Sequence, residues 1–200
     1  MAYSAEEEQD LEQLKSWWQQ NYLVIIIAVI IAFVAVFGWR YWQSYQQEKM
    51  LQASHQYEQL LYQNKDNSAQ IAELIQQHGN SSYAVFALLD QAKNAVEKQQ
   101  FAEAENALKQ ATQQAKDDIL LSISAIRLAA VQYQQQQFDQ ALESLKLVKG
   151  DVWQSRKDLL TGDILLAKGD KAGAKASYQQ AQNQANPFEQ QWIEVRLNNL

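Results

Sequence analysis

The stretch LVIIIAVIIAFVAVFGW, residues 23–39, is the longest apolar run in the chain, and no charged residue lies between Lys15 and Arg40. At ~1.5 Å rise per residue it forms roughly 26 Å of helix, near the short end for a hydrocarbon core of ~30 Å. Aromatic residues, which concentrate at membrane–water interfaces, extend it on both sides. We therefore expect a transmembrane helix over residues 22–41, with interface anchors at Trp17, Trp18, Tyr22, Trp39, Arg40, Tyr41 and Trp42.

Two other interpretations of this run fit the sequence less well. A secretory signal peptide has a basic start and a small-residue cleavage site, whereas residues 6–12 are acidic and the run ends in bulky side chains. A core helix of a soluble protein is seldom apolar on every face for this length. We therefore predict an uncleaved membrane anchor. Its orientation stays open on charge, because Lys15 on one side and Arg40 and Lys49 on the other differ too little.

Composition limits the function classes. The net charge of −6 disfavours nucleic acid as a partner, since binding phosphate requires a basic stripe. The chain has no cysteine, which excludes disulfides, thiol catalysis and thiolate-bound metals. One proline, few glycines and many Ala, Leu and Gln residues are typical of an all-α domain, and the length after the anchor fits one domain.

The part after the anchor contains repeated helical hairpins. Ala104, Ala141 and Ala174 occupy equivalent positions, and their separations of 37 and 33 residues bracket the period of about 34 that is typical of tetratricopeptide repeats. Gly162 and Tyr178 fall at the small-residue and aromatic positions of the last repeat. We expect a TPR-like solenoid over residues 42–200, with hairpins at about 85–118, 122–155 and 155–188, because stacked hairpins bury apolar faces that one hairpin cannot bury alone.

The first helix of each hairpin carries the expected apolar face. The predicted core positions are Val85, Leu88, Leu89, Ala92 and Val96; then Leu121, Ala125, Leu128, Ala129 and Gln132; then Leu160, Ile164 and Leu165. Gln132 stands where a larger apolar residue is usual, so the middle repeat matches the pattern least well.

Local signals define both ends of the solenoid. Asn186, Pro187 and Glu189 predict a capping box that starts a polar-faced capping helix over residues 187–200. Upstream, residues 40–62 and 69–78 predict two helices of a degenerate first hairpin, joined by a loop at residues 64–68.

No residue pattern indicates catalysis, a cofactor or a metal. His55 and His78 lack the spacing of metal ligands. Glu103, Glu105, Asp117 and Asp118 are interpreted as residues of solvated helix faces. In the acidic tail, residues 1–21, Leu11, Leu14 and Trp18 share one helical face, which predicts a short interfacial helix whose acidic side disfavours anionic lipid and leaves a protein contact open.

These observations favour a membrane-tethered, non-enzymatic binding module. Its candidate protein-binding groove uses the first helices of the hairpins and contains Tyr83, Phe86, Gln91, Arg127 and Tyr133. A purely structural scaffold of a membrane complex, without client contact, is the alternative. An enzyme would require a polar cluster that the sequence does not indicate.

Several stretches together resemble a known family: GWRYW at residues 38–42, IRLA at 126–129, KGDVW at 149–153, LLAKGDK at 165–171 and LNNL at 197–200. Over nearly its whole length the chain resembles the ancillary SecYEG translocon subunits, YfgM-type inner-membrane tetratricopeptide proteins of gammaproteobacteria. The resemblance implies a cytoplasmic tail and a periplasmic domain, association with the translocon and a PpiD-type periplasmic chaperone, and help in transferring exported proteins to chaperones. It also implies restraint of a cytoplasmic stress-response regulator through the tail.

Overall fold

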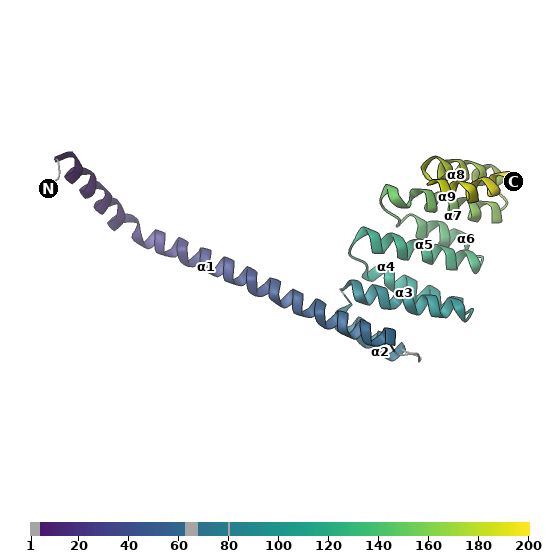
Figure 1. Ribbon diagram of the computed structural model, residues 1–200, viewed down its shortest axis with the longest axis horizontal. Helices are drawn as coiled ribbons and strands as arrows, with labels where there is room; N and C mark the ends of the chain where they lie inside the picture. Colours follow the sequence, from purple (N-terminus) through teal and green to yellow (C-terminus); the bar gives the residue numbers. More distant parts are fainter. Residues whose placement is uncertain (1–4, 63–67, 80) are drawn as a thin grey trace. The chain divides into compact units, whose positions relative to one another are not determined.

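The computed structural model describes residues 5–62, 68–79 and 81–200, whose regular secondary structure is helical with no strand (Figure 1). The chain divides into two compact units, residues 1–49 and residues 50–200. The predicted all-α fold class is confirmed. Part of the predicted loop at residues 64–68 lies outside the described residues.

The first unit consists of most of helix α1 (Ala5–Tyr62), which runs without a break through the acidic tail and the apolar run. Side chains of the run are exposed, for example Ile31, Val34 and Phe37 at 63%, 67% and 62%. In the described part of the chain, α1 is the one helix long and apolar enough to cross a membrane, and none of its most apolar window is buried. The tail is therefore the first part of this helix and does not form a separate short one.

The second unit is a series of antiparallel helices, shown in Figure 1 as successive pairs. In chain order they are α2 (Ser68–His78), α3 (Ser82–Glu97), α4 (Phe101–Gln114), α5 (Asp118–Gln134), α6 (Phe138–Leu145), the 3-10 helix η1 (Asp151–Trp153), α7 (Gln154–Ala167), α8 (Lys171–Gln184) and α9 (Pro187–Asn198). Helix α6 has eight residues, whereas α4 and α8 have fourteen each. The middle hairpin therefore ends earlier than the predicted residue 155, and η1 leads into α7.

The turns inside the three hairpins repeat the same backbone geometry. Gln99, Gln136 and Gly169 adopt positive φ angles of 60°, 60° and 88°. In each turn the next residue's N–H bonds to a carbonyl five residues earlier, at 2.8, 2.9 and 2.9 Å. These turn residues are separated by 37 and 33 positions, the same offsets as the three alanines. The left-handed conformation reverses the chain and ends each first helix.

Small residues lie where paired helices approach most closely. Ala104, Ala141 and Ala174 are fully buried. At Gly162, a Cβ would lie 2.3 Å from Cε1 of Tyr178, so only glycine fits beneath that ring. The predicted core face is otherwise buried or partly buried, except that Val96 is 38% exposed near the end of α3.

Side chains cap the starts of the last two helices. The Asp170 carboxylate accepts from the Gly173 N–H at 2.8 Å. At α9, the Asn186 side chain accepts from the N–H groups of Phe188 and Glu189, and the Glu189 carboxylate accepts from the Asn186 N–H, which completes a capping box. The start of α9 is therefore fixed by three hydrogen bonds of its own sequence.

Candidate protein-binding surfaces

Two of the predicted groove residues belong to an aromatic cluster. The rings of Tyr83 and Phe86 on α3 lie 6.1 Å apart, and both lie within 6.0 Å of Tyr57 near the end of α1. The Tyr57 hydroxyl donates to Asp90 Oδ2 at 2.6 Å, which fixes that ring against α3. Phe86 remains 36% exposed, so the cluster presents aromatic surface to solvent while its inner side packs on the core.

The other three predicted groove residues lie apart from this cluster. Arg127 on α5 is exposed, and its guanidinium contacts no partner among the described residues. Tyr133 is partly buried, because its ring packs against Phe138 at 6.0 Å in the core of the middle hairpin. Gln91 is half-buried on α3. The structure therefore brings together Tyr83 and Phe86, with Tyr57 added.

The middle repeat contains a buried polar network centred on Glu105. The prediction that Glu105 is solvated is wrong, because only 7% of the residue is exposed. Its carboxylate accepts from Lys109 at 2.8 Å, Gln135 at 2.8 Å and Gln132 at 3.3 Å. Burial alone would raise the pKa of Glu105, but these hydrogen bonds together outweigh burial and lower it.

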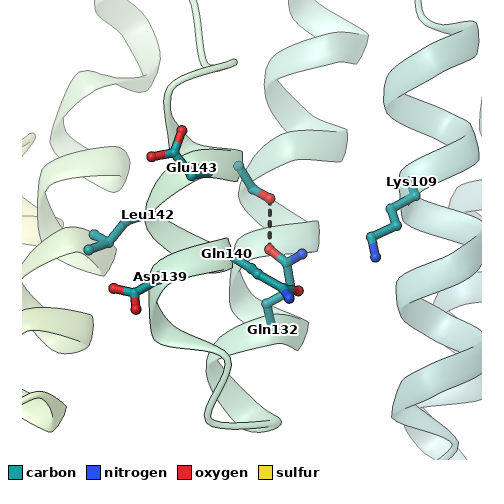
Figure 2. A pocket seen from close by; sticks show the side chains of 7 residues that line it. Lys109, Gln132, Asp139, Gln140, Leu142 and Glu143 are labelled. Atoms are coloured by element: carbon teal, nitrogen blue, oxygen red, sulfur yellow. Dashed lines mark hydrogen bonds between the residues drawn. The ribbon is translucent and has the colours of Figure 1, made fainter.

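Gln132 is part of this network and is almost fully buried in place of the usual apolar residue. Its amide oxygen accepts from the Ser144 hydroxyl at 2.7 Å, the dashed line in Figure 2. The middle repeat therefore matches the pattern weakly because a polar residue replaces an apolar one. The hydrogen bonds of Gln132 connect α4, α5 and α6 and provide the partners that a buried polar group requires.

An open cavity of about 610 Å³ lies beside this network, with Lys109 of α4 across from Gln132 (Figure 2). Asp139 and Glu143, on the α6 side, already pair with Lys168 and Lys146. The lining residues are Lys109, Gln132, Asp139, Gln140, Leu142, Glu143 and Ser144. The charged side chains that line this cavity are paired within the chain.

A second polar network connects the last three helices. The Asp163 carboxylate on α7 accepts from the buried Tyr178 hydroxyl at 2.8 Å and from Arg196 Nε at 2.7 Å. Burial, followed by the bond to Asp163, raises the pKa of Tyr178, and the bond to Asp163 raises the pKa of Arg196. These bonds hold α9 against α7 through Arg196.

Helix α9 does not present the polar outer face that we predicted. Phe188, Trp192 and Val195 are 68%, 55% and 55% exposed, while Ile193 on another face of the helix is fully buried. The Phe188 and Trp192 rings meet edge to face at 6.3 Å. We refer to these three exposed residues as the α9 stripe. Their spacing of i, i+4 and i+7 is visible in the sequence and could have indicated this face.

Comparisons with known proteins give the family. The family model of the tetratricopeptide repeat-like domain matches residues 15–200. A protein of Aggregatibacter actinomycetemcomitans is 58% identical and one of Haemophilus influenzae is 50% identical, each over the full length of both chains. A third, from Escherichia coli, is 31% identical over 97% of this chain and 96% of its own. All three carry the name ancillary SecYEG translocon subunit.

The chain belongs to the family of ancillary SecYEG translocon subunits. The resemblance inferred from short stretches of sequence is thereby confirmed. In this family member, the predicted anchors Trp17, Trp18, Tyr22, Trp39, Tyr41 and Trp42 are all exposed on α1, as is Arg40. Trp39 and Trp42 contact each other at 5.5 Å.

Side chains of the types that ligate metals are dispersed in the described part of this family member. No group of three or more His, Cys, Asp or Glu residues there is arranged to hold an ion. His55 lies 3.9 Å from Glu58 on an exposed helix face. The exposed features of the described chain that carry aromatic or unpaired charged side chains include the Tyr57–Tyr83–Phe86 cluster, Arg127 and the α9 stripe.

Proposed function

We propose that this chain is a membrane-tethered, non-catalytic protein-binding adaptor associated with the SecYEG translocon. The observation that carries the proposal is the name shared by relatives that are 50–58% identical over their full lengths. An apolar helix followed by a tetratricopeptide repeat-like domain supports it, because stacked helical hairpins form extended binding surfaces.

We infer a single-pass location in the bacterial inner membrane. The span covers residues 22–41, with residues 1–21 in the cytoplasm and residues 42–200 in the periplasm. The exposed aromatic residues on both sides of the apolar run support the span, since Trp and Tyr are enriched at membrane interfaces. The orientation rests on the family resemblance, because the nearby basic residues are too evenly divided.

The proposed mechanism is tethering. The anchor confines the binding domain beside the translocon, which raises its effective concentration for emerging polypeptides and for a PpiD-type periplasmic chaperone. Weak contacts then suffice to pass an exported protein onward. Exposed aromatic surface at Phe86 and the free guanidinium of Arg127 are suited to such contacts, because unfolded segments present apolar side chains and backbone carbonyls.

The acidic tail gives the adaptor a second proposed contact. Leu11, Leu14 and Trp18 are exposed on α1 at 53%, 67% and 54%, beside Asp10 and Glu12. A helix with this apolar face and acidic side can bind a basic surface of a cytoplasmic response regulator. We propose that the tail restrains such a regulator.

Photocrosslinking in living cells tests the adaptor role. A photoreactive amino acid is placed at position 86, 127 or 152, and the crosslinked partners are identified by mass spectrometry. Position 152 is the control, because Val152 is 87% exposed and lies outside the predicted groove. We expect translocon subunits, the chaperone and exported chains from positions 86 and 127. Cytoplasmic proteins alone would contradict both the adaptor role and the orientation.

A charge reversal separates the adaptor from a purely structural scaffold. Arg127→Glu changes an exposed side chain that has no partner in the described chain, so the fold should not change. The adaptor account predicts loss of crosslinks to exported chains, while copurification with the translocon is retained. Lys98→Glu, an exposed reversal outside the groove, is the matched control. Unchanged client crosslinks in Arg127→Glu would favour the scaffold.

A further inference from the structure

The α9 stripe is an apolar helix face that nothing in the described chain covers. Phe188, Trp192 and Val195 repeat at i, i+4 and i+7, so they form a straight line of about 10 Å along the helix. The helix itself is well held, because Ile193 is buried and the capping box fixes its start. The stripe is therefore a preformed surface on a rigid element.

Helix α9 differs from the helices that precede it in what it packs against. Helices α3, α5 and α7 each pack against the helix that follows, as do the two helices of every tetratricopeptide hairpin. In the described chain α9 packs against α8 and is bonded to α7 through Arg196 and Glu189. An exposed line of apolar residues on such a helix matches the seam along which a second helix packs.

One charged side chain is bonded to α9 at the residue after Phe188 and has unused hydrogen-bond donors. Arg156 on α7 bonds through Nε to Glu189 of α9 at 3.1 Å, and its guanidinium carbon lies 5.7 Å from the Trp153 ring centroid. Its side chain is 60% exposed, and its two terminal nitrogens have no partner among the described residues. Those nitrogens can pair with a carboxylate from outside the chain.

Charge and area select the kind of occupant. Residues 154–200 hold six Lys and Arg against five Asp and Glu, while residues 1–153 hold eleven against eighteen. The end of the domain that carries α9 is therefore positive by one charge, although the whole chain has a net charge of −6. Repulsion between two chains that each carry −6 disfavours the pairing of whole copies. Three side chains also cover far less than the ~800 Å² that each partner contributes to a stable dimer.

We propose that the α9 stripe and Arg156 together bind an amphipathic helix of a different protein, whose apolar side chains cover the stripe and whose acidic rim residue pairs with Arg156. Trp, Tyr and Arg are enriched among the residues that dominate interface energetics, and this surface contains Trp192 and Arg156. The contact is small and therefore transient. The inference rests on the proposed adaptor function, in which membrane tethering raises the occupancy of weak contacts.

Synthetic peptides test this inference on the full chain in lipid nanodiscs. Three labelled helical peptides are compared by fluorescence anisotropy: one with a leucine seam and a glutamate rim, one with the same seam and a lysine rim, and a scrambled peptide without periodicity. Trp192→Ala and Arg156→Gln are the test variants. Val152→Ala and Lys175→Gln are the matched controls, since both residues are exposed elsewhere. Empty nanodiscs measure binding to lipid.

We expect the glutamate-rim peptide to bind most tightly, Trp192→Ala to weaken it at least tenfold, and Arg156→Gln to remove its advantage over the lysine-rim peptide, with both controls unchanged. Equal binding of the scrambled peptide, or no effect of Trp192→Ala, would overturn the inference. A dimer in sedimentation equilibrium that Trp192→Ala dissociates would assign the surface to a second copy and also overturn it. The photocrosslinking experiment at positions 86 and 127 does not depend on these peptide measurements. Failure of the proposed adaptor function can therefore be distinguished from failure of the inference about the α9 stripe.

Discussion

The contact between Gly162 and Tyr178 shows how single residues specify this repeat. Tyr178 is fully buried, and its hydroxyl is held by Asp163 at 2.8 Å, so its ring cannot move away. A Cβ at position 162 would lie 2.3 and 2.5 Å from two carbons of the ring. The close approach of α7 and α8 therefore depends on the missing side chain at Gly162.

Gly162→Ala is expected to destabilise the domain by about 1–3 kcal/mol, because overpacking a rigid site costs more than the helix propensity that alanine gains. Urea unfolding of the full chain in mild detergent, followed by circular dichroism, measures this. Gly38→Ala is the control, since a methyl group added at Gly38 would meet no side chain within 4 Å. Equal urea midpoints for the two variants would show that the contact with Tyr178 does not prevent a side chain at position 162.

A substitution at Gln136, in the turn of the middle hairpin, is expected to stabilise the domain. Gln136 holds φ = 60° with a side chain, a conformation that costs an L-residue ~1–2 kcal/mol, whereas glycine occupies the equivalent position 169. Gln136→Gly should raise the free energy of unfolding by roughly 0.5–1 kcal/mol, less than the full strain because glycine loses more chain entropy.

Gln134→Gly is the matched control for this turn, because Gln134 is exposed at the end of α5. Glycine in a helix costs ~1 kcal/mol relative to alanine, so that variant should unfold at lower urea. If both variants lose stability, the left-handed conformation at Gln136 is not strained.

At the scale of elements, the Glu105 network binds α4 to α5 and makes the stability of the middle repeat dependent on pH. The pKa of Glu105 is lower in the folded chain than in the unfolded chain, since its hydrogen bonds favour the carboxylate. Its contribution is therefore fully present above the ordinary glutamate pKa of ~4.3 and is lost as the pH falls through the folded pKa.

Glu105→Gln should cost about 1 kcal/mol at pH 7, and this difference from the parent chain in the free energy of unfolding should shrink as the pH falls below the ordinary glutamate pKa of ~4.3. Urea midpoints at several pH values measure this difference. Glu103→Gln, exposed on the same helix, is the control and should leave the urea midpoint at pH 7 close to that of the parent chain. A difference for Glu105→Gln that is constant with pH would contradict the role of the ionised carboxylate.

The start of α9 provides the second element-scale prediction. Asn186 accepts two N–H groups of the first turn, each at 3.0 Å, so Asn186→Ala should cost about 1 kcal/mol and expose the first turn of α9 to hydrogen exchange. Asn183→Ala, exposed on α8, is the control and should leave exchange unchanged. Unaltered protection at Phe188 and Glu189 in Asn186→Ala would show that packing alone holds the helix.

At the scale of the whole molecule, local signals predicted much of the fold. The apolar run and the capping box at Asn186 each depend on neighbours in sequence, and the alanines spaced by 37 and 33 residues mark a hairpin pattern that the chain repeats. Helix formation and helix ends are governed by such short-range chemistry, which is why the sequence indicates them.

The features that sequence did not predict depend on contacts between distant residues. Tyr57 joins Tyr83 and Phe86 because the end of α1 packs on α3, and the period of the hairpin repeats does not extend to it. Glu105 and Gln132 are 27 positions apart, so the residues next to either one in sequence do not indicate that the Gln132 amide donates to the Glu105 carboxylate. The α9 stripe was missed because a capping helix was expected to be polar outside.

The adaptor account depends most directly on which side of the membrane each end occupies, and cysteine labelling tests this cleanly because the chain has no cysteine. One cysteine is introduced at Glu12 or at Val152. Spheroplasts, in which the periplasmic side of the inner membrane is exposed to the medium, are then treated with a maleimide that does not cross this membrane. The account predicts labelling at position 152 before permeabilisation and at position 12 only afterwards. The reverse pattern would place the helical hairpins in the cytoplasm and contradict a periplasmic adaptor.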